Sequence, residues 1–317
     1  MVKKNGFILP TVAIVLILAI IAFVLYQRFG LKIPVNLPIA SPSPTSGITP
    51  SPSPTVAPTK SPTPKPVSTA TGTPKPTTAP VSGPPGAGYS TITVATEKGN
   101  FSASVLSIDL NSARMITDTG NDGDCGNDCT VISLQDYVNR NGGFAGVNGT
   151  YFCPPDYADC ASKKNSYDFS VYNTRLGHWI NQGMLSWGSR AIFYFDGGGA
   201  HYQQNSAGFG GSLTAGIVNY PGLISGGVVQ IDDAQSGLSD KQKAKGTKVG
   251  IGMRNEKNIM IVIGRNVTMQ EFAYVFKALS ATGALNLDDG GSTALYYNGR
   301  YLAGPGRLLP NAVIFAR

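Results

Sequence analysis

The chain has 317 residues, of which 42% are hydrophobic, and a formal net charge of +7 at neutral pH. The excess positive charge lies in residues 1–96, which hold seven Lys or Arg and no acidic residue, so residues 97–317 have no formal net charge. Because a nucleic-acid-binding domain normally carries a positive face on its folded part, this distribution excludes that class of protein.

The N-terminal segment predicts a membrane anchor. Residues 7–26 form an almost unbroken apolar run, which has the length that a helix needs to cross a bilayer. The run is too long for a typical signal-peptide core, and no small-residue cleavage site follows it closely, so residues 1–33 are interpreted as a cytoplasmic tip and an uncleaved signal anchor. The alternative is a prepilin-like leader, although Thr11 stands where such leaders usually carry Glu.

Residues 34–88 predict a disordered stalk. They contain 16 of the 22 prolines, mostly after Ser, Thr or Lys, and no aromatic residue. Such a segment buries too little apolar surface to offset its ordering entropy, and as polyproline II it reaches about 170 Å when fully extended. Its Ser and Thr residues are typical O-glycan acceptors, so we expect the stalk and the following domain, residues 89–317, to lie outside the cytoplasm.

Four cysteines in the domain predict disulfide bonds. Cys125, Cys129, Cys153 and Cys160 suggest two bridges in one of three pairings, because an even number of cysteines beyond a membrane is typical of a disulfide framework. The alternative is a zinc site, but neither pair has the Cys-x-x-Cys spacing that favours zinc. Residues 122–128 carry spaced oxygens like a calcium loop; because the loop lacks the twelfth-position Glu and contains a cysteine, we interpret it as disulfide-tied.

The domain contains more predicted strands than helices. β-Branched and aromatic residues predict strands at residues 91–95, 101–110, 191–195, 248–253, 258–263 and 311–315. A short helix is predicted at residues 133–139, and a capping box at residues 268–271 opens a second helix. The residues expected on the core-facing side of that second helix are Phe272, Val275, Phe276 and Leu279. Without regular βαβ alternation, the pattern predicts an α+β fold with a mixed β-sheet and flanking helices.

Residues 284–299 concentrate polar groups between two predicted strands. The turn between these strands carries Asp288, Asp289, Gly290, Gly291 and Ser292. Successive glycines permit positive φ and let backbone N–H groups approach a ligand, and such amides form a concavity that suits a phosphate. The alternative is an ordinary hairpin turn, since the same residue types are the commonest turn formers.

Three further segments carry groups that a site for a phosphorylated sugar would need. Asn148 stands at the end of a predicted strand, and Lys248 and Arg254 are the cations of another. Arg307 and Asn311 come just before the last strand. Together with the acidic turn, these segments supply carboxylates, cations and amides.

The order of these segments resembles that of the phosphodiester glycosidase family. The family pattern runs Val-Asn-Gly-Gly-Tyr-Phe, Arg-Thr-Ala-Ile-Gly and Asn-Leu-Asp-Gly-Gly-Gly-Ser, followed by an Arg and an Asn before the final strand. Here the corresponding segments are residues 147–152, 248–252 and 286–292, with Arg307 and Asn311. The resemblance covers nearly all of residues 90–317.

The chain departs from this family pattern at three positions. Thr150 and Asp289 stand where the family commonly has Gly, and Lys248 replaces Arg. Lys keeps the charge but lacks the bidentate fork that suits phosphate, and Asp289 adds a negative charge near the expected anion site. These departures predict either weaker binding of a phosphodiester or a different substrate.

The resemblance implies roles for the candidate site residues. In glycoside hydrolysis two carboxylates usually divide the acid, base and nucleophile work, so the expected catalytic set is Asp288 with Asp289 as partner and Asn148 as a hydrogen-bonding group. The residues expected to bind the substrate are Lys248, Arg254, Gly290, Gly291, Ser292, Arg307 and Asn311. The alternatives are a surface ion pair for Arg307 and backbone bonding for Asn148 and Asn311. We expect no cofactor and no metal.

The sequence therefore predicts a membrane-anchored, extracytoplasmic glycosidase that hydrolyses sugar-phosphate diesters of envelope polysaccharide or glycolipid. Its expected partners are this carbohydrate and the membrane, and no nucleic acid. The alternative is a non-catalytic carbohydrate-binding or wall-organising module on the same fold, which the departures at Asp289 and Lys248 would favour. A serine hydrolase is not expected, because neither His178 nor His201 lies near a Gly-x-Ser-x-Gly elbow.

Overall fold

The computed structural model of the chain describes residues 82–234 and 237–317. The predicted anchor, residues 1–33, and the predicted stalk up to residue 81 lie outside the described residues. Within residues 82–234 and 237–317, no helix combines the length and the apolar composition needed to cross a membrane. The described part forms three β-sheets with three α-helices.

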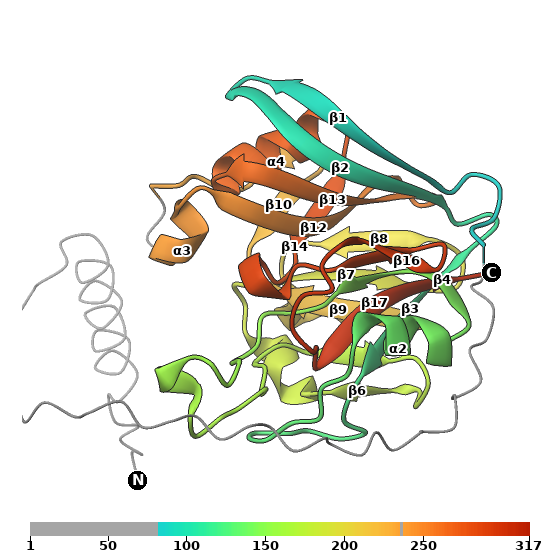
Figure 1. Cartoon of the computed structure of the whole chain (residues 1–317), viewed down its shortest axis with the longest axis vertical. Coiled ribbons are helices and arrows are strands. Elements are labelled where there is room, and N and C mark those ends of the chain that lie inside the picture. The colour runs from blue at the N-terminus through green and yellow to red at the C-terminus, as the bar shows by residue number, and fades with distance from the viewer. Residues whose placement is uncertain (1–81, 235–236) are drawn as a thin grey trace, which may run out of the picture. The chain divides into compact units, whose positions relative to one another are not determined.

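The first sheet has seven strands and lies at the top of Figure 1. Its strands in spatial order are β1 (Gly88–Thr96), β2 (Gly99–Asp109), β13 (Asn258–Val267), β12 (Gly246–Asn255), β14 (Gly283–Asn286), β10 (Gly222–Ser225) and β11 (Val228–Val229). Alternate residues of β13 enter two different cores, with Ile259 and Ile261 on one face and Met260 and Val262 on the other. The centre of this sheet is therefore buried on both faces, which explains its nearly continuous apolar sequence.

Helix α4 (Met269–Ala278) covers one face of the first sheet (Figure 1). Its predicted capping box is confirmed: the Glu271 N–H donates to Thr268 Oγ1 at 3.1 Å, and Glu271 Oε2 accepts from the Thr268 N–H at 2.9 Å. The predicted core face is also confirmed, since Phe272, Val275 and Phe276 are fully buried and Leu279 packs against the same cluster. A Cβ at Gly250 or Gly252 of β12 would lie within 3 Å of the Phe276 ring, so these glycines let the helix approach the sheet.

The second sheet has five strands and carries helix α2 on its outer face. Its strands in spatial order are β16 (Arg300–Ala303), β15 (Leu295–Tyr297), β4 (Gly143–Asn148), β17 (Asn311–Ala316) and β3 (Arg114–Thr119). Helix α2 (Leu134–Arg140) begins at the N-cap Ser133, whose side chain accepts from the Asp136 N–H at 3.1 Å. Leu134, Tyr137 and Val138 are buried against this sheet, as predicted for a short helix in this segment.

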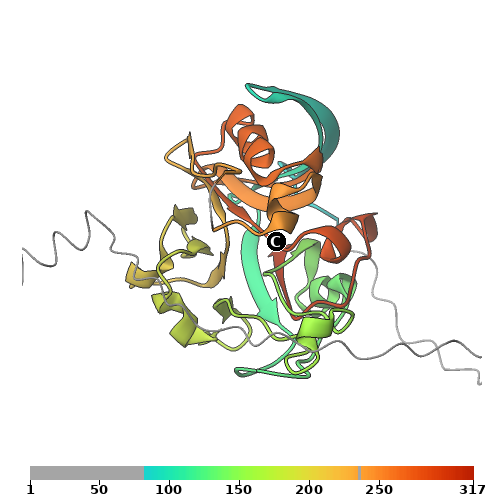
Figure 2. The same cartoon turned by 90° about the vertical axis from the view of Figure 1, so that its left-hand side faces the viewer.

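The third sheet also has five strands, and it completes a core that all three sheets share. Its strands in spatial order are β6 (His178–Ile180), β5 (Val171–Asn173), β9 (Ala215–Asn219), β7 (Ala191–Phe195) and β8 (Ala200–Gln203). The largest hydrophobic cluster joins Ile261 of the first sheet, Phe315 of the second and Phe193 of the third. Figure 2 shows the three sheets grouped around this common centre. The short helix α3 (Asp240–Lys243) lies between β11 and β12 in the chain.

All six predicted strands are confirmed, but the mixed sheet is not. Every strand pair in the described part of the chain is antiparallel, and the fold is mostly β with few helices. Consecutive strands such as β1 and β2, or β12 and β13, are joined by two-residue connections, which can only link antiparallel strands. Helices α2 and α4 do connect parallel strands, β3 with β4 and β13 with β14. In each sheet, however, an antiparallel strand, β17 or β12, lies between the two connected strands, so no neighbouring strands in the described part are parallel.

Contacts to the folded part begin a few residues before the predicted domain start at residue 89. The Gly83 N–H donates to Asn298 Oδ1 at 2.6 Å, and Ser112 Oγ donates to the Pro85 carbonyl at 2.8 Å. Ala87 packs against the largest hydrophobic cluster. The Ser82 carbonyl also accepts from Arg317 Nη2 at 3.0 Å, so the end of the predicted stalk lies against the domain from residue 82 onward.

Candidate active site

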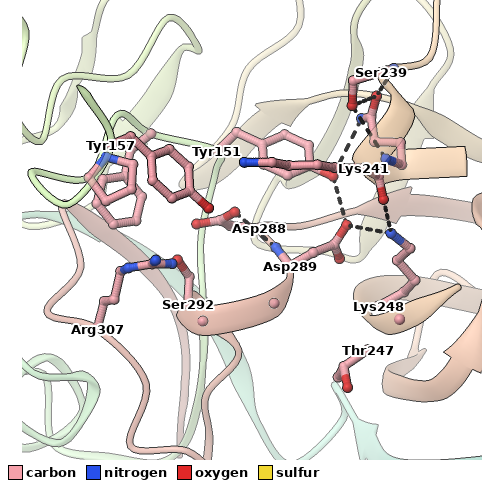
Figure 3. Close-up of a pocket in the computed structure, with 16 residues that line it drawn as sticks. Tyr151, Tyr157, Ser239, Lys241, Thr247, Lys248, Asp288, Asp289, Ser292 and Arg307 are labelled. Carbon is pink, nitrogen blue, oxygen red and sulfur yellow. Dashed lines mark hydrogen bonds and ion pairs between the residues drawn. The ribbon is translucent and has the colours of Figure 1, made fainter. Parts of the chain in front are cut away.

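A cavity of about 400 Å³ opens beside the acidic turn (Figure 3). The predicted site residues that line it are Lys248, Asp288, Asp289, Gly290, Gly291, Ser292 and Arg307. The predicted residues that do not line it are Asn148, Arg254 and Asn311. The remaining walls come from the segment after β4, which includes Tyr151 and Tyr157, and from the segment around α3, which includes Lys241.

The acidic turn connects two different sheets. Strand β14 precedes the turn and pairs with β10 and β12 in the first sheet, whereas β15 follows it and pairs with β4 in the second. The alternative of a hairpin turn is therefore wrong, because the flanking strands do not pair with each other. Gly290 adopts φ = 61°, a left-handed conformation that favours glycine, and it begins a short 3₁₀ turn, η4 (Gly290–Ser292).

Three buried asparagines hold the ends of three strands together. Asn148 ends β4, Asn219 ends β9 and Asn286 ends β14, so each of the three sheets contributes one of them. Asn219 Nδ2 donates to the Asn286 carbonyl at 2.8 Å, and Asn219 Oδ1 accepts from the Tyr151 N–H at 3.3 Å. Asn286 Nδ2 donates to the Tyr151 hydroxyl at 2.7 Å. The cavity thus lies where the three sheets meet.

Asn148 bonds to the backbone at both ends of the turn, and its side chain does not line the cavity. Its Nδ2 donates to the Asp288 carbonyl at 2.8 Å, and its Oδ1 accepts from the Ala294 N–H at 3.0 Å. Both polar atoms of this fully buried side chain are therefore used to join the two ends of the turn. This geometry fits the alternative of backbone bonding, and it makes Asn148 a positioning residue for Asp288.

Asn311 and Arg254 also bond away from the cavity. Asn311 Oδ1 accepts from the Thr150 N–H, and its Nδ2 donates to Thr150 Oγ1, both at 2.9 Å. Arg254 is exposed and donates from Nε to the carbonyl of Leu279 at the end of α4, a usual place for a cation beside a helix terminus. Arg254 lies six positions after Lys248 along β12, which is about 20 Å at the rise of an extended strand, so one cavity cannot use both.

Asp288 presents its carboxyl group to the cavity. In Figure 3 the group points toward Tyr157 and Arg307. Its Oδ1 accepts from the Asp289 N–H at 2.9 Å, and the residue is only 8% exposed. Burial raises the pKa of Asp288 to about 7, against smaller opposing effects that include a hydrogen bond with Ser292 and the charge of Arg307. The cavity therefore contains a carboxyl group that exchanges a proton near neutral pH.

Asp289 points in the opposite direction and is held by three groups (Figure 3). Its carboxylate accepts from the Tyr151 hydroxyl at 2.8 Å and from the Val249 N–H at 3.0 Å, and its Oδ2 lies 3.8 Å from Lys248 Nζ. Burial raises the pKa of Asp289 to about 6, while the charge of Lys248 opposes the increase. Lys248 is 3% exposed and also donates to the Lys241 carbonyl at 2.9 Å. Two of the three departures from the family pattern therefore form one ion pair.

A cationic rim surrounds the Asp288 side of the cavity. The Tyr157 ring lies between Lys241, with Nζ 4.0 Å from the ring centre, and Arg307, with Cζ 5.4 Å from it. Arg307 Nη2 also contacts Asp156 Oδ2 at 2.6 Å, and Asp156 neutralises only part of the two positive charges. A Cβ at Gly291 would lie 2.6 Å from Arg307 Nη1, so glycine is needed there for the guanidinium to approach the turn.

Both predicted disulfides are confirmed, and the structure gives their pairing. Cys125 bonds to Cys129 and Cys153 to Cys160, with Cα–Cα distances of 5.7 and 5.3 Å, so none of the four cysteines is free to bind zinc. The second bridge closes the loop that carries Asp156 and Tyr157. It therefore ties part of the cavity wall into a short ring.

The described residues contain no cluster of three or more His, Cys, Asp or Glu side chains that could hold a metal ion. In the loop that resembles a calcium site, Asp122 pairs with Arg175, Asp124 accepts from the Asn181 N–H and Asp128 lies 3.9 Å from Lys164 Nζ. These carboxylates are directed to different partners and do not converge.

Several cavity residues have little or no signal in the sequence. Tyr157 lies in a loop and Lys241 in the short helix α3, and both join the cavity only through the fold. The sequence does carry a weak signal for Asn219 and Asn286, because β4, β9 and β14 each consist of apolar residues and glycine followed by a final Asn. Tyr151 lies within the predicted segment of residues 147–152, but its partner Asp289 is 138 positions away.

Comparison with solved structures shows that the fold is shared with distant proteins. A hypothetical protein from Synechocystis matches with a TM-score of 0.56 and 14% identity, over 73% of this chain and 62% of its own length. The catalytic domain of zebrafish N-acetylglucosamine-1-phosphodiester alpha-N-acetylglucosaminidase, described as auto-inhibited by its pro-peptide, matches with a TM-score of 0.56 and 15% identity, over 75% of this chain and 86% of that domain. This chain thus spans less than two thirds of the Synechocystis protein. At these identities the likeness concerns the fold alone.

Sequence comparison identifies the family directly. No curated protein sequence matches the chain. The family model for phosphodiester glycosidases, however, matches residues 141–316, which is more than half of the chain and runs from the end of α2 to β17. This range contains every residue of the cavity wall. The chain therefore belongs to the phosphodiester glycosidase family.

Proposed function

We propose that this protein is a glycoside hydrolase that cleaves sugar-phosphate diester linkages in the cavity beside Asp288. The observation that carries the proposal is the position of the Asp288 carboxyl group, which is buried, has a pKa raised to about 7 by that burial, and faces the cationic rim of Arg307 and Lys241. A diester of this kind combines an anion with a sugar carbon that becomes electron-poor during cleavage. The cavity offers cations that can bind the phosphate anion and a carboxylate that can act at the electron-poor sugar carbon.

The reaction that fits this arrangement breaks the bond between the anomeric carbon and the phosphate oxygen. The electron pair stays on the phosphate, which leaves as a monoester and is held by Arg307 and Lys241. A phosphate monoester is a good leaving group, so little general-acid help is needed. Water adds to the anomeric carbon and passes a proton to the carboxylate of Asp288, whose pKa near 7 suits a base that works at neutral pH.

Asp289 has a supporting role in this proposal. Its carboxylate is occupied by Tyr151, the Val249 N–H and the charge of Lys248, so its negative charge is largely compensated before a substrate binds. The departures from the family pattern at Asp289 and Lys248 therefore give much less reason to expect that the cavity binds an anion weakly. The non-catalytic alternative therefore loses its main support and becomes an outcome of the assay below.

The proposed location is the outer face of a membrane, and it rests on the sequence. An apolar run of the right length, a proline-rich stalk and two disulfides suit a domain held beyond a membrane. The substrates within reach of such a domain are envelope polysaccharides and glycolipids that contain sugar-phosphate diesters.

The proposal is tested by incubating the full chain with methyl diesters of glucose, galactose, mannose and N-acetylglucosamine 1-phosphate, as both anomers. NMR would follow the release of free sugar and methyl phosphate. We expect one or more diesters to be cleaved, the Asp288→Asn variant to be inactive, and the matched carboxylate control Glu256→Gln, at an exposed position outside the cavity, to behave as wild type. If these diesters bind without cleavage, the non-catalytic alternative holds and the proposed activity fails.

A further inference from the structure

A second cavity, of about 710 Å³, lies beside the third sheet and contains a cation held between two aromatic rings. Arg190 lines this cavity, and its Cζ lies 4.3 Å from the centre of the Phe169 ring and 4.1 Å from that of the Trp187 ring. Contacts with two aromatic rings restrain the position of the guanidinium, whose N–H groups can still donate hydrogen bonds. Trp187 is 45% exposed, which is unusual for a large aromatic side chain.

Arg190 has no counter-ion among the residues that the structure describes. No carboxylate in residues 82–234 or 237–317 lies within ion-pair distance of it, and the hydrogen bond of its guanidinium within this part of the chain runs from Nη1 to the Asp168 carbonyl. Among the other cations that line the two cavities, Arg307 pairs with Asp156 and Lys248 with Asp289, whereas Lys241 forms no ion pair within the described residues. The charge of the Asp168 carboxylate acts on Arg190 only from beyond ion-pair distance. A partly buried guanidinium without a direct ion-pair partner is suited to bind an anion such as phosphate.

The rest of the second cavity suits a sugar. Its wall includes the aromatic side chains of Phe169 and Tyr220 and the polar side chains of Gln204, Asn205 and Gln230. Aromatic faces pack against the C–H groups of a sugar ring, and amides donate and accept hydrogen bonds with its hydroxyls. The volume lies within the usual range for a small-ligand site.

The two cavities share a wall. Tyr151 lines the cavity beside Asp288, Phe169 lines the second cavity, and the centres of their rings are 6.4 Å apart. One short segment also borders both, since Gly237 lines the second cavity and Ser239 lines the first. The two cavities are therefore neighbours, so the repeats of one polymer need to span only a short distance to reach both.

We infer that the second cavity binds the next anionic repeat of a sugar-phosphate polymer whose neighbouring diester is cleaved beside Asp288. The phosphate of that repeat contacts Arg190, and its sugar packs against Tyr220. This inference rests on the proposed function and narrows it, because a polymer of sugar-phosphate repeats fills both cavities whereas a single diester fills one. The second cavity increases affinity through a second attachment point and takes no part in bond cleavage.

The test measures binding separately from turnover. Synthetic oligomers with one to four sugar-1-phosphate repeats, joined through phosphodiesters and made from each of the four sugars above, are titrated calorimetrically into the full chain carrying Asp288→Asn. We expect the affinity for at least one sugar series to rise about tenfold or more between one and three repeats, as one charge-assisted contact predicts. Arg190→Gln should reduce the affinity for the longer oligomers to that for the single repeat, and Arg190→Lys should retain part of the gain.

Two further variants separate the anion site from stability and from general charge effects. Ser189→Asp places a negative charge at an exposed position of the same cavity without removing the stacked guanidinium, so it should also remove the gain with length, even if Arg190→Gln proves unstable. Arg300→Gln removes an exposed cation elsewhere and should keep the gain. The inference is overturned if no series gains affinity with length, or if the gain persists in both Arg190→Gln and Ser189→Asp.

Hydrolysis by the wild-type chain decides the proposed activity independently. If single diesters are cleaved but affinity does not increase with oligomer length, the proposed active site is supported and the second binding site is contradicted. If affinity increases with oligomer length and depends on Arg190, but the chain cleaves none of the diesters, the second binding site is supported and the proposed activity is contradicted.

Discussion

Asp288 and Asp289 are neighbours in the chain, yet their carboxyl groups lie in different surroundings. The backbone at Asp289 is extended, with φ = −111° and ψ = 179°, and successive side chains of an extended chain point to opposite sides. Asp288 therefore faces the cavity and Arg307, whereas Asp289 faces Lys248 and Tyr151 (Figure 3). A single turn thus provides one carboxyl group that can exchange a proton and one carboxylate that is held by hydrogen bonds and an ion pair.

We predict that Asp288→Asn abolishes turnover of a sugar-phosphate diester and leaves substrate affinity nearly unchanged. The amide keeps the shape of the side chain but cannot accept a proton from water, so kcat and kcat/KM should fall together. In the wild type, kcat should rise with pH through about 7 and then level off, because the deprotonated form is the base. A variant that turns over as fast as the wild type, or a profile without an inflection near pH 7, would contradict the assignment.

The same group should make the stability of the fold depend on pH. Its pKa in the folded state, about 7, is higher than its ordinary value of 3.8, so the folded state holds the proton more tightly than the unfolded state does between these limits. The free energy of unfolding should therefore decrease as the pH rises from about 4 to 7, by an amount of up to about 4 kcal/mol. Denaturant unfolding at pH 5 and pH 8 should show a smaller decrease for Asp288→Asn than for the wild type. Equal decreases would contradict the raised pKa.

The ion pair of Lys248 and Asp289 should behave as a unit. Asp289→Asn leaves the buried ammonium of Lys248 without its counter-ion and should cost about 3 kcal/mol or more of unfolding free energy. Asp289→Gly should be no better, although it restores the residue that is common in the family. Lys248→Met combined with Asp289→Asn should recover most of the loss, which denaturant unfolding of the two single variants and the double variant would measure. Additive losses would show that the two side chains do not interact.

At the scale of elements, the cavity depends on short loops that are fixed at their ends. The loop closed by Cys153 and Cys160 carries Tyr157 between two cations, and its Asp156 contacts Arg307. The strands next to this loop are paired within the sheets and therefore have less freedom to move. The disulfide therefore stabilises a part of the wall that sheet hydrogen bonds do not reach.

We predict that replacing Cys153 and Cys160 together by Ser lowers kcat/KM about tenfold, because the released loop no longer orients Arg307 toward the turn. The free energy of unfolding should fall by about 2–3 kcal/mol, as expected for a short closed loop. The matched control replaces Cys125 and Cys129, which lie outside the cavity wall, and should lower stability by a similar amount with kcat/KM unchanged. Equal effects of the two pairs on kcat/KM would contradict this role of the loop.

At the scale of the whole molecule, the three sheets meet at one point and the site lies there. Strands β4, β9 and β14 each end at this point with a buried asparagine, and the bonds among Asn148, Asn219, Asn286 and the intervening backbone join the sheets. A site built at such a junction is rigid because each sheet restrains the other two.

We predict that protease added to intact cells releases a folded fragment that begins near residue 82, just before the contacts of Gly83. The proline-rich sequence before it should be cut, because we expect it to be exposed and extended outside the membrane. N-terminal sequencing of the released fragment gives the cleavage position, and its thermal unfolding shows whether it is folded. If the domain is cut only after the cells are permeabilised, the orientation is wrong.

Local patterns in the sequence determined much of this fold. The capping box at Thr268 and Glu271, the apolar face of α4 and the six predicted strands follow from rules that act over a few residues, and all are confirmed. The acidic turn and its glycines were also predicted as a site from composition, although the sequence left a hairpin turn open as an alternative. The even number of cysteines predicted two disulfides but left their pairing open, since pairing depends on distances in space.

Other features depended on tertiary structure. The pattern of single strands does not specify which strands pair, so the antiparallel sheets and the crossing of the acidic turn from one sheet to another could not be read from it. Lys248 and Arg254 look equivalent in the sequence, yet an extended strand separates them by about 20 Å and only Lys248 reaches the cavity. Asp289 and Lys248 seemed to be separate departures from a family pattern, and only folding brings them to within 3.8 Å. The physical reason is the same in each case: sequence rules act over neighbouring residues, whereas the charge and geometry of this cavity come from groups that only the packing of three sheets brings together.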